Sequence, residues 1–133
     1  MTDLIHLMAD GAPEPVAPFS HAVRAGNWLF VTGQMPTLPG GGQTLVEGGV
    51  EAQTDRAMAN LGLVLDHAGA SLADVVSVRI YLTHFERDYA LMNAAYRRHF
   101  APGRLPARTC IGVTGLALGA LVEIDMVAWL GRT

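Results

Sequence analysis

The chain has no lysine, a single cysteine and few charges. All nine of its basic residues are arginines, and only 16% of its 133 residues are charged, against about 25% in an ordinary globular domain. The lone Cys110 excludes an intramolecular disulfide and a zinc site built from cysteine pairs. The formal net charge is −3, and no Lys/Arg cluster is longer than Arg97-Arg98. Nucleic acid is therefore not an expected partner.

Several catalytic motifs are also missing. No G-x-G-x-x-G fingerprint is present, and the three glycines at 40–42 lack the lysine and the helix of a phosphate-binding loop. The five histidines show neither H-x-H nor H-x-x-x-H spacing, so we expect no metal site. No G-x-S-x-G elbow supports a serine hydrolase.

The sequence contains no targeting signal or membrane span. The first residues include Asp3 and lack a basic segment before an apolar one, unlike a signal peptide. No apolar run reaches the ~18 residues of a membrane helix. We expect a soluble, cytoplasmic protein with no membrane partner.

The length predicts one domain over residues 1–133, since no repeat or linker divides the chain. Half of the residues are hydrophobic. Together with the low charge, this indicates apolar surface that contacts between subunits would cover.

The hydrophobic periodicity predicts an α+β fold. Two helices would cover one face of a five- to six-stranded mixed sheet, and a second subunit would cover the other face. The expected order along the chain is an extended lead-in within 1–14 that continues through the prolines of 9–18, strands at 21–25 and 28–32 around Gly26-Asn27, a possible short strand at 44–46, a helix at 50–67, a strand at 75–83, a helix at 86–100, and a final hairpin of strands 108–114 and 121–129.

Arg108 is the first candidate for chemistry. It begins a strand expected to be buried, where a charge is costly unless it meets an anion. Strand alternation places Arg108, Cys110 and Gly112 on one face. The guanidinium would either clamp a substrate carboxylate or form a salt bridge with Glu123 or Asp125. Cys110 by itself is most simply a buried core thiol.

Glu123 is the second candidate, because its strand is otherwise apolar except for Asp125. Such surroundings raise the pKa of a carboxyl group toward the range of a general acid or base. Whether Glu123 faces the same side as Arg108 depends on the strand register, which the sequence leaves open. The residues alone thus predict a carboxylate-binding pocket with an acid/base group.

Segments spread over residues 15–130 together resemble the RidA family of reactive intermediate deaminases, also called YjgF. The most specific is Pro106-Ala-Arg-Thr-Cys110, followed by Leu121-Val-Glu-Ile124 fifteen residues after the arginine. Others agree in order and spacing: Ala17 to Asn27, Leu29 to Pro36, Glu51 to Thr54 with Asn60-Leu61, Ala68 to Val76, Tyr81 to Thr83, and Met92-Asn93 with Tyr96 and Phe100.

The resemblance implies a chorismate-mutase-like fold in a barrel-like homotrimer, with sites between subunits. It implies cofactor-free hydrolysis of enamines and imines such as 2-aminoacrylate and 2-iminopropanoate to 2-keto acids and ammonia. In that reaction Arg108 would bind the substrate carboxylate and Glu123 would activate water. The other pocket residues implied are Gly33, Thr32, Cys110, Asn93 and Phe19.

One position departs from the family, which often has tyrosine where this chain has Phe19. Phenylalanine cannot hydrogen-bond a substrate or its water, so activity could be lower or directed to bulkier imines. Two alternatives stand beside the general deaminase. One is a pathway-specific deaminase of the same superfamily, and the other is a non-catalytic trimer that binds small carboxylates or acts as a chaperone. Ribonuclease activity, ascribed to relatives, fits the acidic pI poorly.

Overall fold

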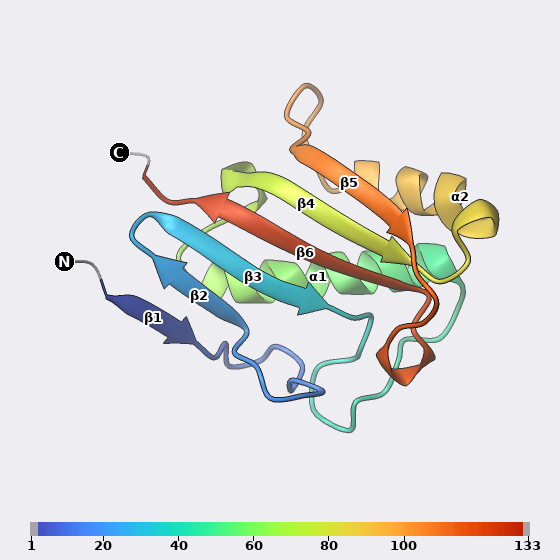
Figure 1. Cartoon of the computed structure of the whole chain (residues 1–133), viewed down its shortest axis with the longest axis horizontal. Helices are drawn as coiled ribbons and strands as arrows, with labels where there is room; N and C mark the ends of the chain where they lie inside the picture. Colours follow the sequence, from blue (N-terminus) through green and yellow to red (C-terminus); the bar gives the residue numbers. More distant parts are fainter. Residues whose placement is uncertain (1–2, 132–133) are drawn as a thin grey trace.

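The computed structural model describes residues 3–131 as a six-stranded sheet backed by two helices (Figure 1). The sheet order is β1-β2-β3-β6-β4-β5; β4 and β5 run parallel, and the other neighbouring strands are antiparallel. The elements are β1 (Leu4–Leu7), β2 (Ala22–Ala25), β3 (Trp28–Gln34), α1 (Val50–His67), β4 (Val75–Leu82), α2 (Phe85–Arg97), β5 (Ala107–Gly112) and β6 (Val122–Trp129), with 3-10 turns at Leu72–Asp74 and Ala117–Gly119.

The core lies between the sheet and the helices, which Figure 1 shows on the same side, with α2 behind β4 and β5. Alternate residues of the central strands point into it. Fully buried side chains include Leu29, Ile80, Leu82, Val122, Ile124, Met126, Met58, Leu61, Leu65 and Met92. The expected arrangement of two helices on one face of a mixed sheet is confirmed.

The boundaries of α1 agree with the sequence prediction, whereas α2 ends at Arg97, three residues earlier than predicted. The predicted hairpin of β2 and β3 forms, with Gly26 at a φ of +61° between Ala25 and Trp28. Gly69, at φ +77°, follows the last residues of α1. Both positive φ angles suit glycine, because it has no Cβ.

Three sequence predictions are wrong. The last two strands do not form a hairpin: β5 pairs with β4, which lies between β5 and β6. The segment 44–46 contributes only an isolated bridge between Thr37 and Leu45. The sixth strand is instead β1, inside the segment predicted as an extended lead-in. Residues 1 and 2 of the predicted lead-in lie outside the described part of the chain.

The face of the sheet opposite the helices carries large apolar side chains. Trp28, Phe30, Ile111 and Trp129 are each between 39% and 49% exposed there, and the two tryptophan rings lie 4.7 Å apart. Trp28, Phe30 and Trp129 lie together on β3 and β6, whereas Ile111 lies apart on β5. An exposed group of large apolar side chains is typical of a surface that contacts another protein. Neither helix within residues 3–131 is both long and apolar enough to span a membrane.

Candidate active site

Arg108 lies on the helix-covered face of the sheet. Its strand partner is Val78, and that of Cys110 is Ile80, so the predicted sharing of one face by Arg108 and Cys110 agrees with the register. The guanidinium carbon lies 5.1 Å from the ring centre of Tyr96 and 5.8 Å from that of Tyr89. Arg108 Nη2 also donates a 3.3 Å hydrogen bond to the Tyr89 hydroxyl. Two rings of α2 therefore support the arginine.

The salt bridge considered from the sequence, between Arg108 and Glu123 or Asp125, does not form. Asp125 accepts hydrogen bonds from Arg79 at 2.9 Å and from the Tyr81 hydroxyl at 3.0 Å. Both acidic side chains lie on the open face, because their neighbours Ile124 and Met126 point into the core. Arg108 is thus left with aromatic partners, and its charge is available to an added anion.

Cys110 and Asn93 lie on the same side as Arg108. Cys110 is partly buried against the core, and burial raises the pKa of its thiol while Arg108 opposes the change. A thiol in this state is a poor nucleophile. Asn93, on α2, lines a hollow with Arg108, and its Oδ1 is buried without a hydrogen-bond partner in the described chain. We call Arg108, Cys110, Asn93, Tyr89 and Tyr96 the arginine wall.

Glu123 lies on the open face of β6, opposite Tyr81 of β4. Burial raises the pKa of its carboxyl group, and the charge of Asp125 adds to that shift. Its close neighbour is Gly33, where the register of β3 with β6 shifts. A Cβ at position 33 would lie 2.9 Å from Glu123 Cδ and closer still to Oε2. Only glycine leaves room for this carboxylate.

Phe19 and Thr32 belong to the same side of the molecule as Glu123. Phe19 is 36% exposed and lines a small hollow together with Gly33. Thr32 donates its hydroxyl proton to the Ser20 carbonyl at 2.5 Å, which ties the segment containing Phe19 to β3. The hydroxyl of Thr32 thereby positions the pocket segment. We call Glu123, Gly33 and Phe19 the glutamate wall.

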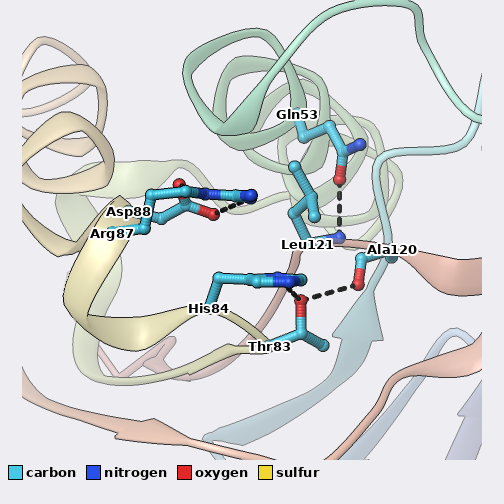
Figure 2. A network of polar contacts seen from close by, with 7 residues as sticks. All are labelled: Gln53, Thr83, His84, Arg87, Asp88, Ala120 and Leu121. Atoms are coloured by element: carbon cyan, nitrogen blue, oxygen red, sulfur yellow. Dashed lines mark hydrogen bonds and ion pairs between the residues drawn. The ribbon is translucent and has the colours of Figure 1, made fainter.

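Polar contacts fix the start of β6, just before Glu123 (Figure 2). The buried Gln53 of α1 accepts a 2.8 Å hydrogen bond from the Leu121 amide. Thr83, after β4, donates from its amide to the Leu121 carbonyl at 3.1 Å and from its hydroxyl to the Ala120 carbonyl at 3.4 Å. Because the residue after β4 and the first turn of α1 both hold this short segment, the position of the glutamate is set by the fold.

The predicted site residues therefore form two groups on opposite faces of the sheet. Within one protomer the arginine wall and the glutamate wall do not meet. Sequence reasoning missed the role of Tyr89 and Tyr96 in holding Arg108, although their helical spacing on one side of α2 was a usable signal. No group of three or more His, Cys, Asp or Glu residues in the described range 3–131 is arranged to hold a metal ion.

Comparison with known proteins gives consistent matches over nearly the whole chain. The model of the family described as Endoribonuclease L-PSP matches residues 9–130. A RutC family protein of Pyrococcus abyssi is 38% identical over 123 residues, which cover 92% of this chain and 94% of the relative. The mouse 2-iminobutanoate/2-iminopropanoate deaminase is 36% identical over 120 residues, covering 90% and 87%. The crystal structure of RidA from an Antarctic Psychrobacter has a TM-score of 0.87 at 31% identity, covering 94% and 98%.

Proposed function

This chain belongs to the Endoribonuclease L-PSP family, which includes the RidA and YjgF proteins, and from that premise we propose that it hydrolyses 2-imino acids to 2-keto acids and ammonia. The observation that carries the proposal is the state of the two charged groups. Arg108 is supported by aromatic rings instead of a carboxylate, and Glu123 is a half-buried carboxylate with a raised pKa. A clamp for a substrate carboxylate and a general base are the two groups that this hydrolysis needs.

Arg108 binds the substrate carboxylate in this mechanism. A guanidinium presents two parallel N–H donors to the two oxygens of a carboxylate, and the tyrosine rings limit where the guanidinium can lie. The imine carbon is bonded to this carboxylate, so fixing the carboxylate also fixes the reacting atom. Positioning of this kind can supply much of the rate gain, because a protonated imine is already electrophilic.

Glu123 moves the protons. Its carboxylate accepts a proton from water as the water oxygen bonds to the imine carbon, which gives a tetrahedral carbinolamine. The same proton then passes to the nitrogen as the C–N bond breaks and ammonia leaves. The carboxylate takes the hydroxyl proton as the C=O bond of the keto acid forms, and this proton departs with the ammonia as ammonium, which restores the carboxylate. The raised pKa of Glu123 brings its proton affinity closer to that required for both transfers. No cofactor takes part in these steps.

We further propose that the two walls meet between subunits of a homotrimer in the cytoplasm. The walls lie on opposite faces of one protomer, and the open face bearing Glu123 also carries the exposed Trp28, Phe30 and Ile111. Burial of this patch against a second copy would place the arginine wall of one subunit opposite the glutamate wall of the next.

A coupled assay tests the activity. A threonine or serine dehydratase generates the imine, and semicarbazide traps whatever is not hydrolysed. We expect the wild-type protein to suppress semicarbazone formation. Arg108→Ala should lower this activity about 10²–10⁴-fold, because hydrogen bonds to a charged partner contribute about 1.5–3 kcal/mol each. Arg98→Ala is the matched control, since Arg98 pairs with Asp55 away from the walls.

Failure of the wild-type protein to compete with semicarbazide would overturn the deaminase proposal and favour a carboxylate-binding protein without turnover. Full activity in Arg108→Ala would leave the reaction class intact and reject the clamp. The oligomeric state of each variant, measured by light scattering, separates loss of chemistry from loss of assembly.

A further inference from the structure

A hollow of about 270 Å³ separates α2 from the segment that leads into β5. Its volume is slightly below the ~300–1,000 Å³ of ordinary small-molecule sites. Two of the lining residues are arginines and none is acidic: the full set is Asn93, Tyr96, Arg97, Leu105, Pro106 and Arg108. Although the chain has a net charge of −3, this lining makes the electrostatic potential in the hollow around Arg108 positive.

Two buried polar atoms in this lining have no partner within residues 3–131. They are the hydroxyl oxygen of Tyr96 and Oδ1 of Asn93. Tyr96 as a whole residue is only 4% exposed. Burial raises the pKa of Tyr96 to about 12, so the phenol keeps its proton and can donate it to an anion. A buried polar group left unpaired costs about 1–3 kcal/mol, and an anionic ligand would supply the missing acceptor for the Tyr96 hydroxyl. Asn93 Oδ1 is itself an acceptor and cannot pair with an anion.

Arg97 is the second cation of the hollow. It lies one helical turn after Asn93 on the same side of α2. Its neighbour Arg98 pairs with Asp55, and Arg87 pairs with Asp88, whereas Arg97 has no acidic partner among the described residues. Its charge is exposed to solvent and faces the same space as Arg108. Two cations in one hollow suit a ligand that carries two anionic groups.

We propose that this hollow is a subsite for a second carboxylate, and that Arg97 directs the protein toward imines of acidic amino acids, the 2-iminodicarboxylates. The inference rests on the proposed function in one respect, namely that Arg108 holds the carboxylate next to the imine carbon. The side-chain carboxylate then reaches the part of the hollow beside Arg97, where the Tyr96 hydroxyl supplies a further donor. Arg97 is a specificity-determining residue in this arrangement.

Binding of stable keto-acid products tests the subsite without turnover. The probes are 2-oxoglutarate and 2-oxopentanoate, which have the same chain length and differ in the terminal carboxylate. Calorimetric titration of the wild-type protein should give about tenfold tighter binding of 2-oxoglutarate, since one charge-assisted contact contributes about 1.5 kcal/mol or more. Arg97→Ala should remove this preference, Arg97→Lys should keep part of it, and Arg98→Ala should keep all of it.

Equal binding of the two keto acids by the wild-type protein overturns the subsite. Equal weakening of both by Arg97→Ala also overturns it, because Arg97 would then be a second contact to the carboxylate that Arg108 holds. Weakening of 2-oxoglutarate binding alone by Arg97→Ala, with 2-oxopentanoate binding unchanged, supports it.

Turnover of the imines that an amino-acid oxidase makes from glutamate and from norvaline separates this inference from the deaminase proposal. Turnover that favours the glutamate imine and loses the preference in Arg97→Ala supports both. Turnover of the norvaline imine with equal or greater efficiency sinks the subsite and leaves the deaminase standing. Selective binding of 2-oxoglutarate with no turnover of either imine would contradict the deaminase proposal and support the subsite.

Discussion

The charged groups of the two walls have different surroundings. On the arginine wall a cation is covered by the tyrosine rings of α2, while on the glutamate wall an anion is half-buried on a face that no helix covers. If Arg108 and Glu123 touched within one protomer, the arginine would lower the pKa of the glutamate and each would neutralise the other. Their separation by the sheet leaves Arg108 with aromatic partners in place of an acidic one and leaves the pKa of Glu123 raised.

Mixed subunits give the sharpest test of this separation. The Arg108→Ala protein alone and the Glu123→Gln protein alone should each lose about 10²-fold or more in kcat/KM. If each site takes its arginine from one subunit and its glutamate from the next, every hybrid trimer has one complete site. Random mixing makes about three quarters of trimers hybrid, so about a quarter of wild-type activity should return after unfolding and refolding the two variants together.

The control is a mixture of the two folded variants that is not unfolded. If the subunits do not exchange, no hybrids form in it and its activity should stay at the level of the separate variants. Co-refolded mixtures that stay inactive, although native mass spectrometry finds hybrids in them, would place both residues in sites built from one chain. The comparison of the two walls would then lose its functional meaning.

Gly33→Ala tests the glutamate wall alone. The added methyl group would occupy the space of the Glu123 carboxylate, which can swing aside because it ends a flexible side chain. We expect kcat/KM to fall about 10–100-fold through this displacement, with little change in the melting temperature. Gly115→Ala is the control, since a Cβ there meets no atom within 4 Å. A fully active Gly33→Ala would show that the position of the carboxylate is not critical.

The sequence predicted the elements better than their pairing. The period of apolar residues, together with Gly69 after the last turn, delimits α1 on local grounds. β5 pairs in parallel with β4, and α2 forms the crossover between these two strands. The local sequence does not show whether β5 pairs with β4 in this way or with β6 in a hairpin. The strand β1 was missed because its four residues are mostly exposed and lack alternation.

The candidate site was predicted by residue type and not by arrangement. The sequence and its resemblance identified Arg108 and Glu123, but the face on which each lies depends on register. Reading β5 and β6 as neighbours made a salt bridge between them reasonable, and the intervening β4 removes that contact. The partners of Arg108 come from α2, whose packing against β5 is a tertiary property.

Phe19→Tyr should strengthen the glutamate wall. Phe19 shares a hollow with Gly33, so a hydroxyl at this position could reach a substrate or its water. One added hydrogen bond has a net value of about 0.5–1.5 kcal/mol, so we expect kcat/KM for 2-aminoacrylate to rise about 2–10-fold. A parallel measurement with a bulkier imine shows whether the gain is specific to small substrates. Unchanged rates on both would reduce position 19 to a packing site.

The smallest expected effect concerns the charge next to Glu123. In the proposed mechanism, activity requires the ionised carboxylate and is lost as pH falls through its pKa, and burial places that loss above the ordinary glutamate value of 4.5. Asp125→Asn removes the second cause of the raised pKa, so the acid limb of the kcat/KM profile should move to lower pH. The shift should be modest, because Arg79 already lies 2.9 Å from Asp125 and offsets its charge. An acid limb that moves upward, or one that survives unchanged in Glu123→Gln, would mean that another group carries the proton.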